Sequence, residues 1–196
     1  MVLDLITTAQ LGEIAAGRFV LRPARKSDVG LIAHYSSDAR VALGTHSIPH
    51  PLPPGAAEAF VARAMTPRLD EDVWVMDGSA TGLPEVLGVI NLKRMDQGPR
   101  AKSGGGAAGQ SEVSYWVAPA FWKTGIASEA VQALIAANPQ SCRTLFAEVF
   151  QDNAASARVL TNSGFAYLGD AETFSVARGA GADVDLCEKA GLSDYT

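Results

Sequence analysis

The 196-residue sequence has few cysteines, no long apolar run and no excess of positive charge. Cys142 and Cys187 are the only cysteines, and their spacing matches neither a metal site nor a redox pair. No apolar run approaches the length of a membrane span, and residues 1–18 lack the basic and apolar regions of a signal peptide. The sequence therefore predicts a cytoplasmic protein whose two thiols remain reduced.

The absence of positive charge also limits the partners that we expect. With a formal net charge of -5, a nucleic-acid or anionic-membrane surface is not predicted, and an anionic ligand would need a local positive site. The sequence contains no P-loop, no dinucleotide fingerprint and no G-x-S-x-G elbow. A nucleotide-binding module of another kind is therefore a distant alternative, and a nucleophilic triad is not predicted.

Hydrophobic periodicity predicts a single α/β domain. The predicted order is strand, two helices, three strands, helix, strand, helix and two strands, which corresponds to one mixed central sheet flanked by helices. Strands are predicted at residues 18–24, 72–76, 85–95, 111–119, 144–150, 166–176 and 183–189, and helices at residues 27–37, 55–65, 125–138 and 152–165. Residues 45–54 are too rich in proline to be helical.

Residues 98–110 are rich in glycine and predict a flexible, solvated loop between two strands. A glycine run can also bind phosphate through its amides. This one lacks the strand–loop–helix setting that would orient those amides, so a functional role is the minor alternative.

The segment "FWKTGIASEAV" at residues 121–131 predicts an anion site at the start of a helix. The first N–H groups of a helix have no partner within it and carry partial positive charge, so they favour a phosphate. Gly125 lacks a Cβ and would let a ligand approach the backbone closely.

Four segments in this order resemble the GNAT acyltransferases, and more narrowly the RimJ/RimL type that acetylates the N-termini of ribosomal proteins. They are "FVLRPARKSDV", "IPHPLPPGAAEAFV", "EVSYWVAPAFWKTGIASEAV" and "EVFQDNAASARVLTNSGF". The resemblance covers residues 18–190, after an N-terminal extension at 1–17 and before a tail at 191–196. It implies a GNAT fold and the transfer of acetyl from acetyl-CoA, with no metal, to a primary amine such as a protein N-terminal α-amine.

The resemblance also implies how acetyl-CoA would bind. Its pyrophosphate would lie on the amides that open the central helix, and its pantetheine arm would pair with the preceding strand as an added strand. Trp122 stands three residues before Gly125, where the family usually has a basic or amide residue. It would contribute to the pyrophosphate site and could also serve as a packed aromatic side chain. The implied cofactor-binding residues are Tyr115, Trp116, Val117, Trp122, Lys123, Thr124, Gly125, Ile126, Ala127, Asn153 and Ser156.

Catalysis in the family implies direct attack by a neutral amine, without a covalent enzyme intermediate. Ser156 matches the serine that this branch places beside the sulfur, since the position of the tyrosine that other members use is Leu160. The backbone N–H near Trp116 would stabilise the oxyanion. Asn153 would contact the pantetheine arm, cap its helix, or do both.

The base is less well defined by the sequence. Glu112 matches an acidic residue of this branch, but it could instead pair with a neighbouring arginine such as Arg22. The glutamate that the ribosomal branch uses aligns with Ser175, and Glu172 is nearby but out of register. His46 and His50 lie in the loop that should border the acceptor site, as bases or as ordinary loop residues, and His34 is expected to be half-buried.

Three readings of the function remain open from the sequence. The leading one is an acetyl-CoA-dependent N-acetyltransferase acting on a primary amine, for which a protein N-terminal α-amine is one candidate, and the second is acetylation of a small-molecule amine. The third is a non-catalytic CoA-binding sensor, since the helix tyrosine and the hairpin glutamate are absent. We expect a monomer or a homodimer.

Overall fold

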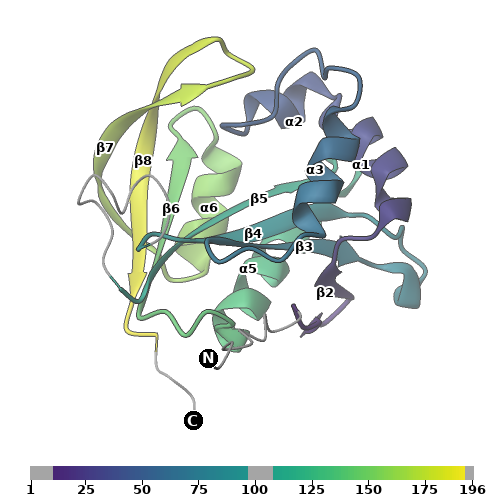
Figure 1. The fold of residues 1–196 in the computed structure, drawn as a ribbon. Coiled ribbons are helices and arrows are strands. Elements are labelled where there is room, and N and C mark those ends of the chain that lie inside the picture. Colours follow the sequence, from purple (N-terminus) through teal and green to yellow (C-terminus); the bar gives the residue numbers. More distant parts are fainter. Residues whose placement is uncertain (1–10, 97–107, 193–196) are drawn as a thin grey trace, which may run out of the picture.

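The computed structural model describes residues 11–96 and 108–192, and Figure 1 shows one sheet with helices on both faces. The strands are β1 (Ile14–Ala16), β2 (Phe19–Pro23), β3 (Glu71–Asp77), β4 (Gly88–Arg94), β5 (Gln110–Val117), β6 (Thr144–Phe150), β7 (Ala166–Ser175) and β8 (Ala180–Ala190). The helices are α1 (Val29–Ser36), α2 (Ala39–Leu43), α3 (Ala56–Ala64), α5 (Ile126–Ala137) and α6 (Ala154–Asn162). Short 3₁₀ turns occupy Lys26–Asp28, Ser79–Thr81 and Pro119–Phe121.

The strands form one eight-stranded sheet in the order β1-β2-β3-β4-β5-β6-β8-β7. Every neighbouring pair is antiparallel except β5 and β6, which are parallel. One hydrophobic cluster joins α1 and α3 to a face of the sheet through Ile32 and Val61, and another joins α5 and α6 through Leu134 and Leu160. The predicted α/β fold with one mixed sheet between helices is confirmed.

Two elements were not predicted. β1 lies within the predicted N-terminal extension and pairs with β2, and α2 follows α1 with Asp38 as its N-cap. With three and five residues, both are too short to produce a visible hydrophobic period. β8 also begins at Ala180, inside the predicted turn, because the hairpin reverses earlier, at residues 176–179.

The predicted flexible loop at residues 98–110 falls mostly outside the described residues. Its last part is described, and there the carbonyl of Gly109 accepts hydrogen bonds from the backbone N–H groups of Arg143 (2.7 Å) and Thr144 (3.3 Å). This end of the loop is therefore joined to the chain that enters β6.

The two cysteines are buried, free thiols. Burial raises the pKa of both Cys142 and Cys187, so each stays protonated near neutral pH. No helix within the described ranges is both long and apolar enough to cross a membrane.

The parallel pairing of β5 with β6 is short and leaves a gap in the sheet. Only three pairs are formed, Gln110 with Thr144, Ser111 with Leu145 and Glu112 with Phe146. Beyond them the strands diverge, so the backbone of residues 113–117 has no β6 partner within the described part of the chain. Backbone groups that face this gap need another partner, since a buried N–H or C=O is costly when unpaired.

A buried arginine fixes β2 and β3 beside this sheet centre. Arg22 is 1% exposed and donates to both carboxylate oxygens of Asp28 (2.8 and 2.9 Å) and to Asp77 (2.5 Å). Burial opposes the charge on Arg22, but the two carboxylates outweigh it and raise its pKa. From the sequence, an ion pair with a neighbouring arginine such as Arg22 was the alternative to a role of Glu112 as the base. The pairing with Arg22 is wrong, because Arg22 binds Asp28 and Asp77.

We expect Arg22→Met to lower the free energy of unfolding by ~3–5 kcal/mol, because it leaves two buried carboxylates without their cation. The measurement is chemical denaturation at neutral pH. The matched control is Arg25→Met, since Arg25 is exposed and its ion pairs are 3.9 Å long. That control should change stability by less than ~0.5 kcal/mol. Equal losses in the two variants would contradict the assignment.

Candidate active site

Two cavities meet at the gap between β5 and β6. One, the α3 cavity, has a volume of about 430 Å³ and is lined by α3, the loop after α2 and the strands beneath them. The other, the α5 cavity, has a volume of about 860 Å³ and extends to the start of α5. Six residues line both: Gly44, Thr45, Tyr115, Trp116, Asn153 and Ser156. The gap therefore joins two hollows, one beside α3 and the other beside the start of α5.

A chain of hydrogen bonds crosses this junction. The hydroxyl groups of Tyr115 and Ser156 lie 2.8 Å apart, and Asn153 Oδ1 accepts from the backbone N–H of Ser156 at 3.1 Å. Asn153 is thus the predicted N-cap of α6 and also lines both cavities. Burial raises the pKa of Tyr115 to about 12, and the hydrogen bond with Ser156 offsets only part of that effect. The Tyr115 hydroxyl is therefore protonated at physiological pH.

The start of α5 exposes backbone amides toward the α5 cavity. The first main-chain bond of the helix runs from the N–H of Glu129 to the carbonyl of Gly125 at 3.0 Å. The amides of residues 126–128 precede this bond, so helix geometry leaves them without a partner in the helix. Ile126 and Ala127 line the cavity, as predicted for an anion site.

Gly125 is needed here for its backbone conformation. Its φ is +86°, in the left-handed region that side chains disfavour, and a Cβ would lie 3.4 Å from the Arg18 guanidinium. Arg18 also donates to the carbonyl of Thr124 (2.9 Å) and pairs with Glu129 (2.8 Å). Arg18 therefore holds the turn and neutralises the carboxylate nearest the helix start.

The α5 cavity is locally positive, although the chain as a whole is acidic. Four cationic residues line it against one carboxylate, Asp152: they are Arg40, Lys123, Arg158 and Arg178. The sequence identified only Lys123, because the other three come from α2, α6 and the β7–β8 turn. No short motif links these elements, so only the fold brings them together.

The predicted cofactor-binding residues gather around this cavity with one exception. Tyr115, Trp116, Val117, Trp122, Lys123, Gly125, Ile126, Ala127, Asn153 and Ser156 line it. Thr124 does not, since its hydroxyl donates to the carbonyl of Phe121 and its own carbonyl accepts from Arg18. Trp122 donates from Nε1 to the carbonyl of Val117 at 2.7 Å, while its exposed ring lies under the Arg40 guanidinium.

The strand register assigns the backbone amide of Trp116 to β4 instead of the gap. Ala118 donates to the carbonyl of Leu87, and hydrogen-bonded pairs alternate along an antiparallel ladder. Trp116, opposite Val89, therefore belongs to a hydrogen-bonded pair with β4. The amides of Tyr115 and Val117 point the other way, toward the gap. An oxyanion donor near Trp116 must come from these neighbours.

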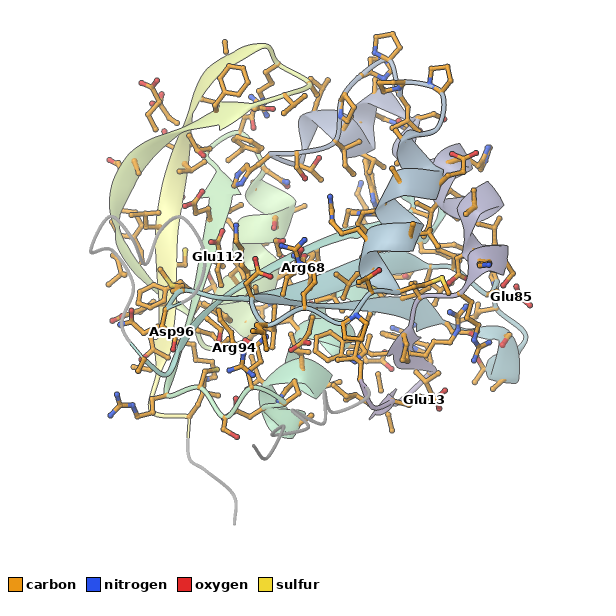
Figure 2. The ribbon with its side chains drawn as sticks, in the orientation of Figure 1. Glu13, Arg68, Glu85, Arg94, Asp96 and Glu112 are labelled. Carbon is orange, nitrogen blue, oxygen red and sulfur yellow. The ribbon has the colours of Figure 1, made fainter. Side chains whose placement is uncertain are left out.

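Glu112 lies among the paired residues of β5 and lines neither cavity. Figure 2 shows it on the side of the sheet that carries α3, whereas Arg94 lies on the side that carries α5. Its partner is not Arg22, which is bound to Asp28 and Asp77. The structure thus separates Glu112 from Tyr115 and Ser156: Glu112 lies where β5 is still paired with β6, and the other two lie where the strands have diverged.

The α3 cavity contains charged groups that the sequence pattern concealed. Glu148 interrupts the apolar run of β6, and its carboxylate lies 3.7 Å from Nδ1 of His46. Glu71 accepts from Asn91 at 2.9 Å, and Asn91 accepts from Ser114 at 2.6 Å, across β3, β4 and β5. A lone acidic residue in the strand "TLFAEVF" was the available signal for Glu148. Of the predicted histidines, His46 lines the cavity, while His50 and the exposed His34 do not.

The β7–β8 turn closes over the loop after α2, as Figure 1 shows. Val176 donates to the carbonyl of His46 at 2.9 Å, and Arg178 donates to the carbonyl of Leu43 at 3.0 Å while pairing with Asp152. Ser175 is fully buried in this contact and donates to the carbonyl of Thr45. Neither Ser175 nor Glu172 lines a cavity, so the hairpin offers no acid at either position.

A protein-family comparison matches residues 18–166 to the family described as "Acetyltransferase (GNAT) domain". The chain belongs to the GNAT acetyltransferases. As a GNAT, it is an acetyl-CoA-dependent N-acetyltransferase, and acetyl-CoA is its co-substrate. A search of curated protein sequences found no match.

Solved structures agree with this fold at low sequence identity. RimL, the ribosomal L7/L12 alpha-N-protein acetyltransferase, in complex with coenzyme A, has a TM-score of 0.74 and 18% identity over 93% of this chain and 100% of its own. Mycobacterium smegmatis RimJ in complex with CoA-disulfide has a TM-score of 0.73 and 18% identity over 93% and 88%. Spermidine N-acetyltransferase from Vibrio cholerae, with CoA and spermine, has a TM-score of 0.69 and 13% identity over 89% and 96%.

The α5 cavity of this GNAT fits the co-substrate. Phosphate groups require positive charge and hydrogen-bond donors, and the cavity supplies four cationic side chains and a helix start with free amides. An extended arm requires unpaired strand backbone, which β5 offers at the gap. These are the chemical features that acetyl-CoA needs, provided by residues far apart in the sequence.

We expect Gly125→Ala to weaken acetyl-CoA binding and to lower stability by ~1–2 kcal/mol, because alanine is strained at a φ of +86°. Calorimetric titration and thermal unfolding measure the two effects. Gly30→Ala in α1 is the control, since nothing lies within 4 Å of its Cβ position. It should leave the affinity unchanged and stabilise α1 slightly. Unchanged affinity in a folded Gly125→Ala protein would argue against the anion site.

Proposed function

We propose that this GNAT transfers the acetyl group directly to a primary amine in a ternary complex, with Ser156 and Tyr115 assisting departure of the sulfur. The observation that carries the proposal is the 2.8 Å contact between the two hydroxyl groups at the junction of the cavities. An acceptor in the α3 cavity and a co-substrate in the α5 cavity would meet there. We assign the acetyltransferase domain to residues 18–190, with β1 extending its sheet from the preceding segment.

The backbone of β5 would stabilise the oxygen of the tetrahedral intermediate. The amides of Tyr115 and Val117 point toward the gap, whereas that of Trp116 belongs to a pair with β4. Fixed N–H donors stabilise negative charge as it develops and need no rearrangement during the reaction. The assignment of this role to Tyr115 and Val117 refines the one given to the strand near Trp116.

The hydroxyl pair would act by hydrogen bonding more than by full proton transfer. With the pKa of Tyr115 raised to about 12 and a thiol of ordinary acidity near ~8.5, transfer of the tyrosine proton to a thiolate is uphill. Hydrogen bonds to a developing anion are nevertheless stronger than those to a neutral group. Tyr115 thus compensates for Leu160, which occupies the position of the usual helix tyrosine and is buried.

The acceptor class is a primary amine, either a protein N-terminal α-amine or a small molecule. RimL and RimJ are similar folds, and the first acetylates a protein N-terminus according to its name, whereas the similar Vibrio cholerae enzyme acts on spermidine. The α3 cavity is within the size range of small-ligand sites. Its volume admits an N-terminal residue equally well.

The function is tested by CoA release with a defined panel of amines. The panel comprises ethylamine, spermidine and the tripeptide Ala-Gly-Gly, with N-acetyl-Ala-Gly-Gly as the blocked control. We expect turnover with at least one free amine and none with the blocked peptide. Release of CoA that is equal with and without amine would indicate hydrolysis, and no release from the folded, cofactor-binding protein would support the sensor reading.

We expect Ser156→Ala and Tyr115→Phe each to lower kcat about ten- to a hundredfold, because each removes a hydrogen bond to developing charge. The affinity for acetyl-CoA should change less than about threefold. The double variant should be little worse than either single variant, since the two groups act as a unit. Tyr167→Phe, which removes an exposed hydroxyl bound to Asp170, is the control. Wild-type kcat in Ser156→Ala would end this assignment.

A further inference from the structure

A histidine and a glutamate face each other in the α3 cavity, outside the residues assigned to the reaction so far. Nδ1 of His46 lies 3.7 Å from Oε2 of Glu148, and the side chains are 31% and 12% exposed. Both residues line the cavity that also contains Tyr115 and Ser156. The pair is therefore accessible to a molecule in the cavity but largely withdrawn from bulk water.

The imidazole is held in place from two sides. Its edge packs on the ring of Phe150 with 4.8 Å between centroids, and Phe150 projects from the same side of β6 as Glu148, two residues earlier. The carbonyl of His46 accepts the N–H of Val176 from the β7–β8 turn at 2.9 Å. The loop that carries the histidine is thus fixed to β6 and to the β7–β8 turn.

We propose that His46 and Glu148 form the base that deprotonates the acceptor, and that the acceptor is an amine that arrives as an ammonium cation. This inference rests on the proposed direct transfer to a primary amine. Glu148 lies on the Nδ1 side of the ring, so the acceptor of the proton is Nε2. The carboxylate stabilises the imidazolium that results, and it attracts the cationic substrate into the cavity.

The proposed transfer conserves protons and electron pairs. The ammonium gives one proton to Nε2 of His46, and the neutral nitrogen then uses its lone pair to form the C–N bond to the acetyl carbon. Collapse of the tetrahedral intermediate breaks the C–S bond, and the electron pair leaves with sulfur. The second proton of the nitrogen passes to sulfur through water or the hydroxyl pair, while His46 releases the first proton to solvent.

Charged groups from several elements surround this pair. Glu148 comes from β6, and the Arg178 guanidinium lies over the Phe150 ring, 4.3 Å from its centroid, and pairs with Asp152. Glu71 and Arg63 line the same cavity from β3 and α3. With two carboxylates, Glu71 and Glu148, against one arginine, Arg63, the cavity wall favours a cationic ligand over an anionic one.

The test compares Glu148→Gln and His46→Gln with the wild type in kcat/KM, using whichever of ethylamine, spermidine and Ala-Gly-Gly the wild type acetylates fastest. A general base contributes ~10²–10⁴ in rate. We therefore expect a loss of at least about tenfold at pH 7 that narrows to about threefold at pH 9, where more of the amine is already neutral. The double variant should resemble the worse single variant.

His50→Gln and Glu172→Gln are matched controls, because both residues are exposed and line neither cavity. Acetyl-CoA affinity and thermal unfolding show that each variant is folded. A loss in Glu148→Gln and His46→Gln that is equal at pH 7 and pH 9 indicates a structural role and overturns the inference, as does full activity at pH 7. If the wild-type protein acetylates none of the amines, the proposed function is contradicted, and so is this inference.

Discussion

The site depends on the early end of a parallel strand pair. β5 and β6 share three residue pairs and then diverge, although both strands continue for several residues. If the pairing continued, the backbone of residues 113–117 would be satisfied within the sheet and the two cavities would be separated. The divergence instead leaves Tyr115 and Val117 facing open space, with Ser156 from α6 opposite them.

Contacts on either side of the gap keep it from collapsing. On one side, Arg22 joins β2 to β3 through Asp77 and to the turn before α1 through Asp28, and on the other β6, β8 and β7 pair as antiparallel neighbours. The β7–β8 turn then reaches back across the gap to the loop after α2 through Val176 and Arg178. The two parts of the sheet are thus separated at the gap between β5 and β6 and connected through the β7–β8 turn.

The fold predicted from the sequence is confirmed, and most of the residues that the sequence proposed for the cofactor line one cavity, because both predictions depend on local patterns. Gly125 and Asn153 stand at helix starts, where a glycine or a capping side chain is visible from neighbouring residues. The remaining residues of the site depend on long-range contacts. Arg40, Arg158 and Arg178 meet around the α5 cavity only in the fold, and Glu148, in the α3 cavity, sits in a strand whose pattern indicates burial. The resemblance alone points to Glu112, and the strand register, which decides what faces the gap, cannot be read from one strand.

The same sheet has two edges that resist pairing with another chain. β1, at one end, has three residues and offers little backbone for a partner strand. β7, at the other end, is ten residues long, but a bulge between Tyr167 and Gly169 interrupts its register, and Asp170 and Glu172 place like charges along it. Bulges and charged side chains are the means by which natural edges avoid becoming templates for aggregation. The sheet therefore has unpaired backbone at the central gap, where the substrates would bind, while its two edge strands disfavour pairing with another molecule.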